Sequence, residues 1–294
     1  MTEPDSFSPE PTADGSFTFF SPEFGEAFHS HYGAKQEAEY KFVKPLQLRQ
    51  KAQKNQIKLL DICYGLGYNT AAALSAIWEV NPNCRVEVVA LESDPRVPRS
   101  AIAQGLLNEY PFPIPKYLAT LADEFRLDID LFNAQLLIGD ARETLPRVYD
   151  SNFRADAICL DPFSPPACPQ LWTVEFLGLA AKCLAPDGRL ATYSCAAAVR
   201  SALLAGGLAI ASTEPRGRRT PGTVANFGGT DLLPLTQRER EHLQTRAAVP
   251  YRDPNLCDRA ESIVERRRQE QSTSALEPTT QWKNRWKRWG IIDN

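Results

Sequence analysis

The chain has no long uninterrupted apolar run, and this absence argues against a membrane-spanning helix. The most apolar stretch, residues 194–212, is interrupted by Arg200 and by two adjacent glycines, whereas a helix that crosses a bilayer needs about 20 apolar residues. The N-terminus is acidic and rich in proline and serine, so it does not resemble a secretory signal. We therefore expect a soluble, cytoplasmic protein.

Cysteine pairs with metal-binding or redox spacing are also absent. The seven cysteines are odd in number, scattered and never spaced as C-x-x-C. Several lie inside apolar runs, which is typical of reduced, buried thiols in a cytosolic protein. We predict neither a disulfide framework nor a metal site.

No strong excess of one charge is present. The chain has 33 basic and 36 acidic residues and a net charge of −3. This balance argues against a protein that coats nucleic acid over its whole surface, but it is compatible with a local basic patch. A chain of 294 residues with 43% hydrophobic content can bury a sizeable core.

The order of the expected elements divides the chain into four zones. Residues 1–16 lack apolar periodicity and are predicted to be disordered, and residues 17–56 form an aromatic N-terminal cap. Strand-like and helix-like segments alternate over 57–230, whereas 231–294 is polar, arginine-rich and helical near 236–247 and 258–271. The expected strands are 57–62, 86–91, 135–138, 155–160, 189–193, 208–212 and 223–227, and the expected helices between them are 70–79, 99–108, 170–183 and 196–205. This alternation predicts a Rossmann-like α/β sandwich whose mostly parallel sheet has a terminal antiparallel hairpin.

The first expected strand leads into a glycine turn with the sequence Tyr64-Gly65-Leu66-Gly67. The two glycines allow a sharp turn and a close approach of the backbone to a ligand, although a purely structural turn has the same pattern. Glu92 ends the second strand 25 residues after Gly67, close to the spacing at which an acid binds ribose hydroxyls. The combination favours a site for a nucleoside cofactor.

The identity of the cofactor depends on a missing third glycine. A dinucleotide fingerprint requires one for close helix–strand packing, and Thr70 stands there instead. This argues against a dehydrogenase and favours S-adenosyl-L-methionine, which has no pyrophosphate. Asp140 follows the third strand and is a candidate acceptor for the adenine amino group, or an N-cap with Glu143 three residues later.

The loop from Asp161 to Thr173 follows a buried-looking strand and contains four prolines, which exclude helix and ladder pairing until about residue 170. It presents a carboxylate and the rings of Phe163 and Trp172 at the edge of the sheet where ligands bind in open α/β folds. The alternative is a proline-rich connection with one capping acid.

Taken together, these motifs resemble the class I S-adenosyl-L-methionine-dependent methyltransferases. More narrowly, the chain is similar to the MnmC-like family of stand-alone, MnmD-type enzymes, which methylate the aminomethyl group on the wobble uridine of tRNA. The resemblance is carried by residues 21–30, 33–38, the glycine turn, 139–142, 161–173, 192–194, 199–200 and 218–224. It spans most of residues 17–227.

The resemblance implies conversion of 5-aminomethyl(-2-thio)uridine to 5-methylaminomethyl(-2-thio)uridine in the anticodon region of tRNA, with separate enzymes supplying the precursor. Too few residues follow Gly229 for the oxidase domain of larger family members, so we expect none. The resemblance also implies catalytic roles for Asp161 and Phe163. The cofactor contacts that it implies are Asp61, Tyr64, Gly65, Gly67, Glu92, Asp140 and Ala141. The implied substrate contacts are His29, Glu37, Pro162, Trp172, Tyr193, Arg218 and Arg219. We expect Asp161 to orient the acceptor amine while Phe163 and Trp172 exclude water.

Two alternatives to this function remain open. In the first, the enzyme acts on another amine or small molecule; in the second, the chain is an inactive RNA-binding module with this fold.

The C-terminal tail from Trp282 to Trp289 interleaves tryptophans with basic residues. Its i, i+4, i+7 spacing indicates either a helix that docks on the core or a segment that stacks on RNA bases.

Overall fold

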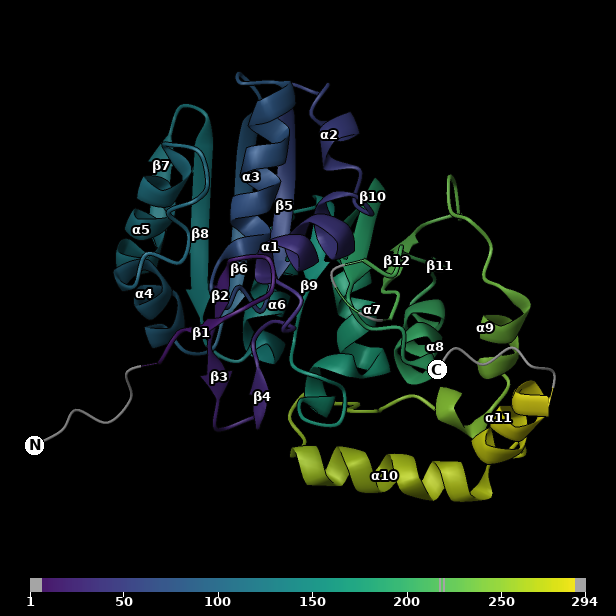
Figure 1. Cartoon of the computed structure of the whole chain (residues 1–294). Helices are drawn as coiled ribbons and strands as arrows, with labels where there is room; N and C mark the ends of the chain where they lie inside the picture. The colour runs from purple at the N-terminus through teal and green to yellow at the C-terminus, as the bar shows by residue number, and fades with distance from the viewer. Residues whose placement is uncertain (1–6, 217, 219, 289–294) are drawn as a thin grey trace, which may run out of the picture.

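The computed structural model describes residues 7–216, 218 and 220–288, and its centre is an eight-stranded sheet (Figure 1). The strand order is β11-β12-β10-β9-β5-β6-β8-β7. The strands are β5 (Gln56–Ile62), β6 (Arg85–Glu92), β7 (Arg126–Ile129), β8 (Phe132–Ile138), β9 (Ala155–Leu160), β10 (Leu184–Thr192), β11 (Ala209–Ser212) and β12 (Thr223–Asn226).

The pairing of the strands is mostly parallel. In the middle strand β5, Leu60 lies opposite Val89 of β6 and Ile158 of β9, both in parallel register. Strand β12 lies between β10 and β11 and is antiparallel to both, and β7 adds an antiparallel strand at the other edge. The predicted α/β class and mostly parallel sheet are therefore confirmed; β7 was not predicted.

Helices cover both faces of the sheet because successive strand residues point to opposite sides. Leu59 of β5 belongs to one hydrophobic cluster and Leu60 to the other. The first cluster includes residues of α1 (Ala34–Glu37), the π-helix η1 (Ala38–Val43), α2 (Leu48–Lys51), α3 (Tyr68–Val80), α4 (Arg96–Ala103) and α5 (Ile114–Glu124). The second includes residues of α6 (Ala141–Asp150), α7 (Val174–Lys182) and α8 (Ala197–Ala205).

The N-terminal segment forms two short hairpins in front of the sheet. Strand β1 (Glu10–Pro11) pairs with β2 (Phe17–Thr18), and β3 (Phe20–Ser21) pairs with β4 (Glu26–Ala27). The sequence predicts disorder up to residue 16, but residues 7–16 are built into the fold. The reason is Asp14, whose carboxylate accepts hydrogen bonds from the amides of Ser16 and Gln36. Residues 1–6 lie outside the described part of the chain.

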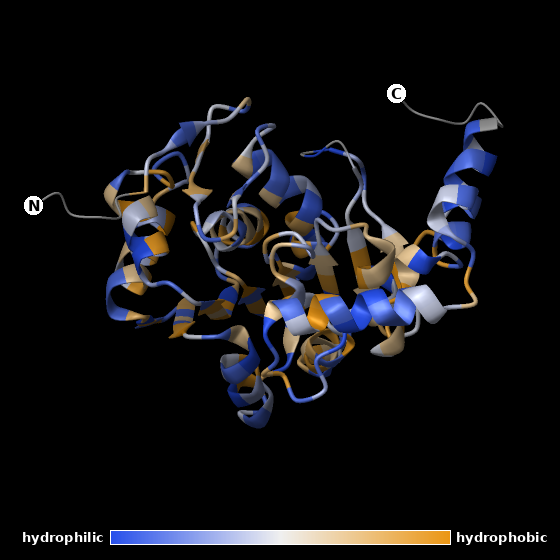
Figure 2. Cartoon of the chain, turned by 90° about the horizontal axis from the view of Figure 1, so that it is seen from below, coloured by the Kyte–Doolittle hydropathy of each residue, from blue (hydrophilic) through white to orange (hydrophobic). Residues whose placement is uncertain are grey.

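The C-terminal extension contains α9 (Gln237–His242), the 3-10 helix η3 (Arg246–Ala248), α10 (Ala260–Thr273) and α11 (Thr279–Arg288). Seen from below, α10 crosses the front of the molecule and is largely hydrophilic (Figure 2). The tail helix α11 packs on α9: Trp282 stacks on His242 with ring centroids 4.5 Å apart, and Trp286 donates to Glu241 at 2.9 Å. Both tryptophans are buried, as the docking alternative predicts. Trp289 lies outside the described residues.

Within the described ranges, none of the helices combines the length and the apolar character that crossing a bilayer demands.

Candidate functional site

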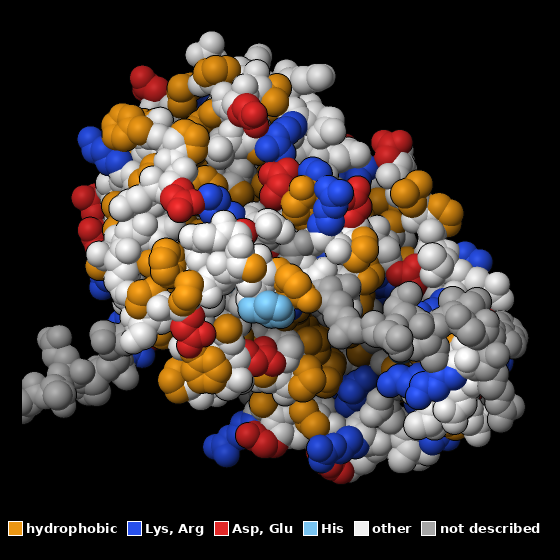
Figure 3. Space-filling model, viewed as in Figure 1, with side chains coloured by type: hydrophobic (Ala, Val, Ile, Leu, Met, Phe, Trp, Pro, Cys, Tyr) orange, Lys and Arg blue, Asp and Glu red, His pale blue; other side chains and the backbone are white. Residues whose placement is uncertain are grey.

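A cavity of about 1110 Å³ lies where the carboxyl ends of the parallel strands meet. It is lined from four strand ends, by Gly65 after β5, Glu92 of β6, Asp140 after β8 and Asp161 after β9. In the space-filling view it corresponds to the hollow in the lower half of the molecule, with hydrophobic side chains in its walls (Figure 3). This edge is where ligands bind in open α/β sheets, as the sequence predicts.

The glycine turn after β5 is held in place by the acid of β6. Gly65 and Gly67 have φ angles of 55° and 88°, which side chains rarely adopt. Glu92 accepts hydrogen bonds from the amides of Gly65 at 2.8 Å and Asp94 at 2.9 Å. Burial raises the pKa of Glu92, although these amides favour its charged form. Gly65 and Glu92 line the cavity, whereas Tyr64 is buried behind the turn.

Asp61 lies beneath the turn rather than in the cavity. Its side chain is fully buried and accepts a hydrogen bond from the Thr70 hydroxyl at 2.7 Å. Burial raises the pKa of Asp61 to about 8. The expected contact with a cofactor is therefore replaced by a structural one: Asp61 ties strand β5 to the first turn of α3. Gly67 also lies outside the cavity lining, and a Cβ there would meet the Tyr64 hydroxyl at 2.7 Å.

Asp140 caps helix α6 and lines the cavity at the same time. Its carboxylate accepts from the Arg142 amide at 2.8 Å, and both of its oxygens also accept from the Arg142 guanidinium. The same guanidinium donates to the fully buried Asp253 of the C-terminal extension at 3.0 Å. Gly139 and Ala141 complete this end of the cavity. The capping and lining roles proposed for Asp140 therefore coexist.

Asp161 begins the proline-rich loop and faces the cavity. Its amide donates to the carbonyl of Ile62 at 3.1 Å, and its carboxylate accepts from the Asn69 amide at 2.8 Å. Removal from solvent and the negative charge of Glu37 raise the pKa of Asp161 to about 7, against the opposing effects of Arg218 and Asn69. At neutral pH, this carboxyl group is therefore poised between its two protonation states.

The loop after Asp161 is fixed by two aromatic side chains. Trp172 donates to the Phe163 carbonyl at 2.8 Å, and Tyr193 donates to the Pro162 carbonyl at 2.9 Å. Tyr193, Pro162 and Phe163 line the cavity, whereas Trp172 is fully buried behind them. The expectation that Trp172 contacts the acceptor does not fit this position: its indole supports the loop instead.

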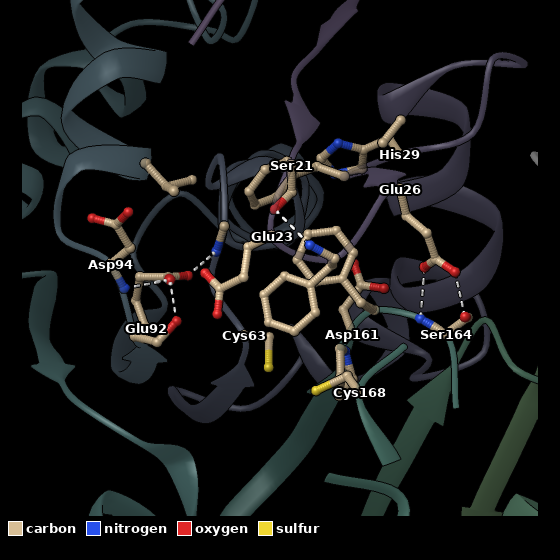
Figure 4. Close-up of a pocket in the computed structure, with 18 of the residues that line it drawn as sticks. Ser21, Glu23, Glu26, His29, Cys63, Glu92, Asp94, Asp161, Ser164 and Cys168 are labelled. Atoms are coloured by element: carbon tan, nitrogen blue, oxygen red, sulfur yellow. Dashed lines mark hydrogen bonds between the residues drawn. The ribbon is translucent and has the colours of Figure 1, made fainter. Parts of the chain in front are cut away.

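The β3–β4 hairpin crosses over this loop, which the sequence did not indicate. The Glu26 carboxylate accepts from both the amide and the hydroxyl of Ser164, the former at 2.9 Å. Phe24 stacks on Phe163 at 4.3 Å between ring centroids, and Phe28 meets the same ring edge-on at 5.0 Å. Figure 4 shows Glu92 and Asp94 at one end of the cavity and the Glu26–Ser164 contact at the other. Only the richness of the lead-in segment in aromatic residues could have signalled this contact.

Glu37 and Arg218 form an ion pair, and the charges of both act on Asp161. Glu37 is buried and also accepts from the Ser30 amide at 3.0 Å. The Arg218 guanidinium lies 3.9 Å from the Tyr193 ring centroid and lines the cavity. The structure thus brings together three side chains that the sequence predicts for substrate binding. Arg219, another of the predicted substrate contacts, lies outside the described residues.

Two further buried side chains support this region. His29 lines the cavity, and burial lowers its pKa to about 4, so its ring is neutral at neutral pH. Lys41 of η1 is fully buried and donates to the carbonyls of Glu214 at 2.8 Å and Thr220 at 2.9 Å, which holds the segment that carries Arg218. Burial lowers the pKa of Lys41 to about 8. Among the described residues, no group of three or more His, Cys, Asp or Glu side chains is arranged to bind a metal.

Comparisons with known proteins agree with this geometry. A family model described as S-adenosyl-L-methionine-dependent methyltransferase matches residues 99–227. The crystal structure of MNMC2 from Aquifex aeolicus superimposes with a TM-score of 0.80 and 34% identity, covering 93% of this chain and 87% of that one. An uncharacterised protein of Methanocaldococcus jannaschii is 31% identical over 87% of this chain and 70% of its own length.

A longer relative matches over part of its length. The tRNA 5-methylaminomethyl-2-thiouridine biosynthesis bifunctional protein MnmC of Paraburkholderia phytofirmans is 29% identical over 71% of this chain. The match covers 33% of that protein, so the chain corresponds to about a third of the bifunctional relative.

Proposed function

Because the chain belongs to the MnmC-like family of S-adenosyl-L-methionine-dependent methyltransferases, we propose that it methylates the primary amine of 5-aminomethyl(-2-thio)uridine at the wobble position of tRNA. The product is 5-methylaminomethyl(-2-thio)uridine. The observation that carries the proposal is the Asp161 carboxylate, held by the Asn69 side-chain amide at 2.8 Å in a cavity that the Phe163 ring also lines.

The cavity offers what S-adenosyl-L-methionine requires. The Gly65 turn presents backbone beside Glu92, which suits the ribose hydroxyls, while Gly139, Asp140 and Ala141 form a separate wall. A cavity of about 1110 Å³ is large enough for the cofactor and an incoming base. When bound, the cofactor supplies an electrophilic methyl group on a sulfonium. The residues of this chain hold the amine in position and set its protonation state.

The amine must be neutral to act as a nucleophile. An alkylamine with a pKa near 10.4 is mostly protonated at pH 7, and reaching the neutral form costs roughly 4–5 kcal/mol. The rings of Phe24, Phe28 and Phe163 form an apolar surround, which disfavours the ammonium form. Asp161 accepts an N–H bond and orients the lone pair. A carboxylate with a pKa near 7 is also a suitable acceptor for the proton that the amine gives up.

Glu37 and Arg218 set the charge around Asp161. Glu37 raises the pKa of Asp161 and Arg218 lowers it. Because the two side chains form an ion pair, their opposite effects on Asp161 partly cancel at the Asp161 end of the cavity (the acceptor end). Most of the rate enhancement then comes from holding the amine in line with the methyl group.

The remaining surface suits a tRNA partner in the cytoplasm. Lys283 and Lys287 on α11 are exposed, as is Arg216, two residues before Arg218 in the chain. These cations can contact phosphates, while the buried Trp282 and Trp286 are occupied in docking. We infer that separate enzymes supply the aminomethyl-uridine precursor.

The direct test is product analysis. The protein is incubated with S-adenosyl-L-methionine and tRNA that carries 5-aminomethyl-2-thiouridine, and nucleosides from the digested tRNA are identified by mass spectrometry. We expect 5-methylaminomethyl-2-thiouridine with the wild type and none with Asp161→Asn. Methylation of free amines without any change in the tRNA would support the small-molecule alternative. Tight tRNA binding without cofactor binding would support the RNA-binding module.

A further inference from the structure

The proline-rich loop that begins at Asp161 is held by hydrogen bonds at each of its first four positions. The partners are Ile62 and Asn69 at position 161, Tyr193 at 162, Trp172 at 163 and Glu26 at 164. The partners at positions 161 and 162 belong to the α/β sandwich, and Trp172 belongs to the end of the loop itself. Glu26, in contrast, lies on strand β4 of the N-terminal segment. Its contact therefore ties the loop that carries Asp161 to a separate element of the fold.

Ser164 is the junction at which this contact acts. The Glu26 carboxylate accepts from both the amide of Ser164, at 2.9 Å, and its hydroxyl, as the dashed lines in Figure 4 show. The Ser164 carbonyl in turn accepts from the amides of Ala167 at 2.9 Å and Cys168 at 2.8 Å, so the same residue begins the next turn of the loop. Hydrogen bonds to a carboxylate are stronger than those between neutral groups, and two from one residue fix its orientation. Glu26 thus determines where the first part of the loop ends.

The hairpin that carries Glu26 depends on the loop for its own position. Strands β3 and β4 have two residues each, and a two-stranded hairpin is at best marginally stable by itself. The fully buried Phe19 anchors the base of the hairpin, whereas Phe24, between the strands, stacks on Phe163 of the loop. Residues of both strands line the cavity. The hairpin is therefore a wall of the cavity that the loop holds in place, and the same contacts hold the loop.

We propose that Glu26 is a positioning residue for the methyl transfer. Through Ser164 it fixes the stretch of chain on which Asp161 and Phe163 lie, and it makes their placement depend on the hairpin wall. A misplacement of about 1 Å can lower the rate of an enzyme about 10²-fold, and Ser164 is only three residues from Asp161. The inference rests on the proposed transfer to an amine held by Asp161, and it adds a role for the N-terminal hairpin in that reaction.

A double-mutant cycle on Glu26→Ala and Ser164→Ala tests the proposal. Single-turnover rates are measured with saturating S-adenosyl-L-methionine and tRNA that carries 5-aminomethyl-2-thiouridine. We expect Glu26→Ala to methylate about tenfold more slowly than the wild type and Ser164→Ala about threefold more slowly. In the Glu26→Ala background, Ser164→Ala should have no further effect, because its hydroxyl has already lost the acceptor.

Two variants and one binding measurement separate positioning from general damage. Ser164→Thr keeps both donors and should methylate at the wild-type rate. Glu124→Gln, at the exposed end of α5, should also match the wild type. Affinity for S-adenosylhomocysteine, measured by isothermal titration, should stay within about twofold of the wild type in every variant, since the contact acts on the loop of the acceptor amine.

Hydrogen exchange on the same proteins tests the contact without any substrate. The peptide that covers residues 161–173 should exchange faster in Glu26→Ala than in the wild type, and strand β5 should exchange at the same rate in both. Unchanged exchange of 161–173 would show that Glu26 does not hold the loop.

Three kinetic or binding results would also overturn the inference. In the first, Glu26→Ala methylates the tRNA at the wild-type rate. In the second, Ser164→Ala slows methylation as much in the Glu26→Ala background as in the wild type. In the third, cofactor affinity falls as much as the rate, and the hairpin then supports the cofactor. A wild type that binds S-adenosylhomocysteine but leaves the tRNA unmethylated would instead contradict the proposed substrate, and the exchange of residues 161–173 would still decide whether Glu26 holds the loop.

Discussion

The side-chain amide of Asn69 donates a hydrogen bond to the Asp161 carboxylate at 2.8 Å. Asn69 lies in the first turn of α3, directly after the glycine turn, and Asp161 lies at the end of β9. The bond therefore joins the first turn of α3 to the start of the proline-rich loop. In the proposed reaction, this bond connects the glycine turn, assigned to the cofactor, with the carboxylate that orients the acceptor amine.

Replacing Asp161 by Asn should separate catalysis from cofactor binding. The amide keeps the size of the carboxylate and can accept from Asn69, but it cannot take a proton. We expect turnover to fall by about 10²–10⁴, with affinity for S-adenosylhomocysteine within about twofold of the wild type. Single-turnover assays and isothermal titration measure the two quantities. Asp128→Asn, at an exposed position of β7, is the matched control. Equal loss of binding and turnover would show that Asp161 contacts the cofactor.

The acid limb of the pH–rate profile should report the ionisation of Asp161. Only its charged form can accept from the amine, so kcat should rise with pH through about 7. The hydrogen bond from Asn69 lowers the pKa of Asp161, so Asn69→Leu should move the acid limb to higher pH. The negative charge of Glu37 raises the pKa of Asp161, so Glu37→Gln should move the acid limb to lower pH.

Profiles recorded from pH 5.5 to 9 with saturating substrates would check these directions. Shifts of the same sign in both variants would contradict the assignment. Thermal unfolding of each variant provides a control for general damage to the fold.

Asp61 should make the stability of the protein pH-dependent. Its pKa is about 8 in the folded chain and close to 3.9 when unfolded. Between these values the folded state holds a proton that the unfolded state releases. The stability that the group contributes is therefore complete below about pH 4 and is lost as the pH rises towards 8, by at most about 1.4 kcal/mol per unit.

The substitution Asp61→Asn removes this titration. The free energy of unfolding of the wild type, relative to that of Asp61→Asn, should fall between pH 5 and 8 in urea titrations. Asp128→Asn should run parallel to the wild type over the same range. If the Asp61 variant also runs parallel, the carboxyl group is ionised in the folded protein.

The two faces of α11 should have separable roles. Trp282→Ala removes a buried ring that stacks on His242, and we expect a local loss on the order of 3–5 kcal/mol. Hydrogen exchange should then accelerate in residues 237–242 and 279–288. Lys283→Ala, which changes an exposed side chain on the same helix, should leave exchange unchanged.

The exposed lysines of α11, Lys283 and Lys287, are expected to contribute to tRNA binding and not to stability. The double variant Lys283→Ala/Lys287→Ala should weaken tRNA binding and reduce its salt dependence by about one counterion per lost phosphate contact. Its thermal stability should match that of the wild type. An unchanged salt dependence would place the tRNA on another surface.

The sequence predicts the order of the central elements well because it follows local periodicity. The strand at residues 155–160 has the predicted bounds, and the strand-end acids Glu92, Asp140 and Asp161 line one cavity as expected. Helix α5 was not predicted; it accommodates Pro115 because proline is tolerated in the first turn of a helix. Its apolar residues Ile114, Leu118 and Leu121 do have helical spacing.

The long-range contacts that hold the cavity wall in place could not be predicted from local periodicity. Glu26 meets Ser164 across 138 residues of sequence, and no local pattern relates two such positions. Trp172 has the composition of a ligand contact, but its burial depends on how the loop packs.

The contacts of helices α1 and η1 also have a consequence for the synthesis of the protein. Glu37 pairs with Arg218 across 181 positions, and Lys41 holds Thr220 across 179. Chains fold from the N-terminus as they emerge from the ribosome, so the glycine turn and its strands are available long before the residues that complete the acceptor end. A nascent chain that stops before residue 218 can form most of the parallel sheet and still leave Glu37 and Lys41 without these partners. The acceptor end is therefore completed only late in translation, close to the moment when the C-terminal extension appears.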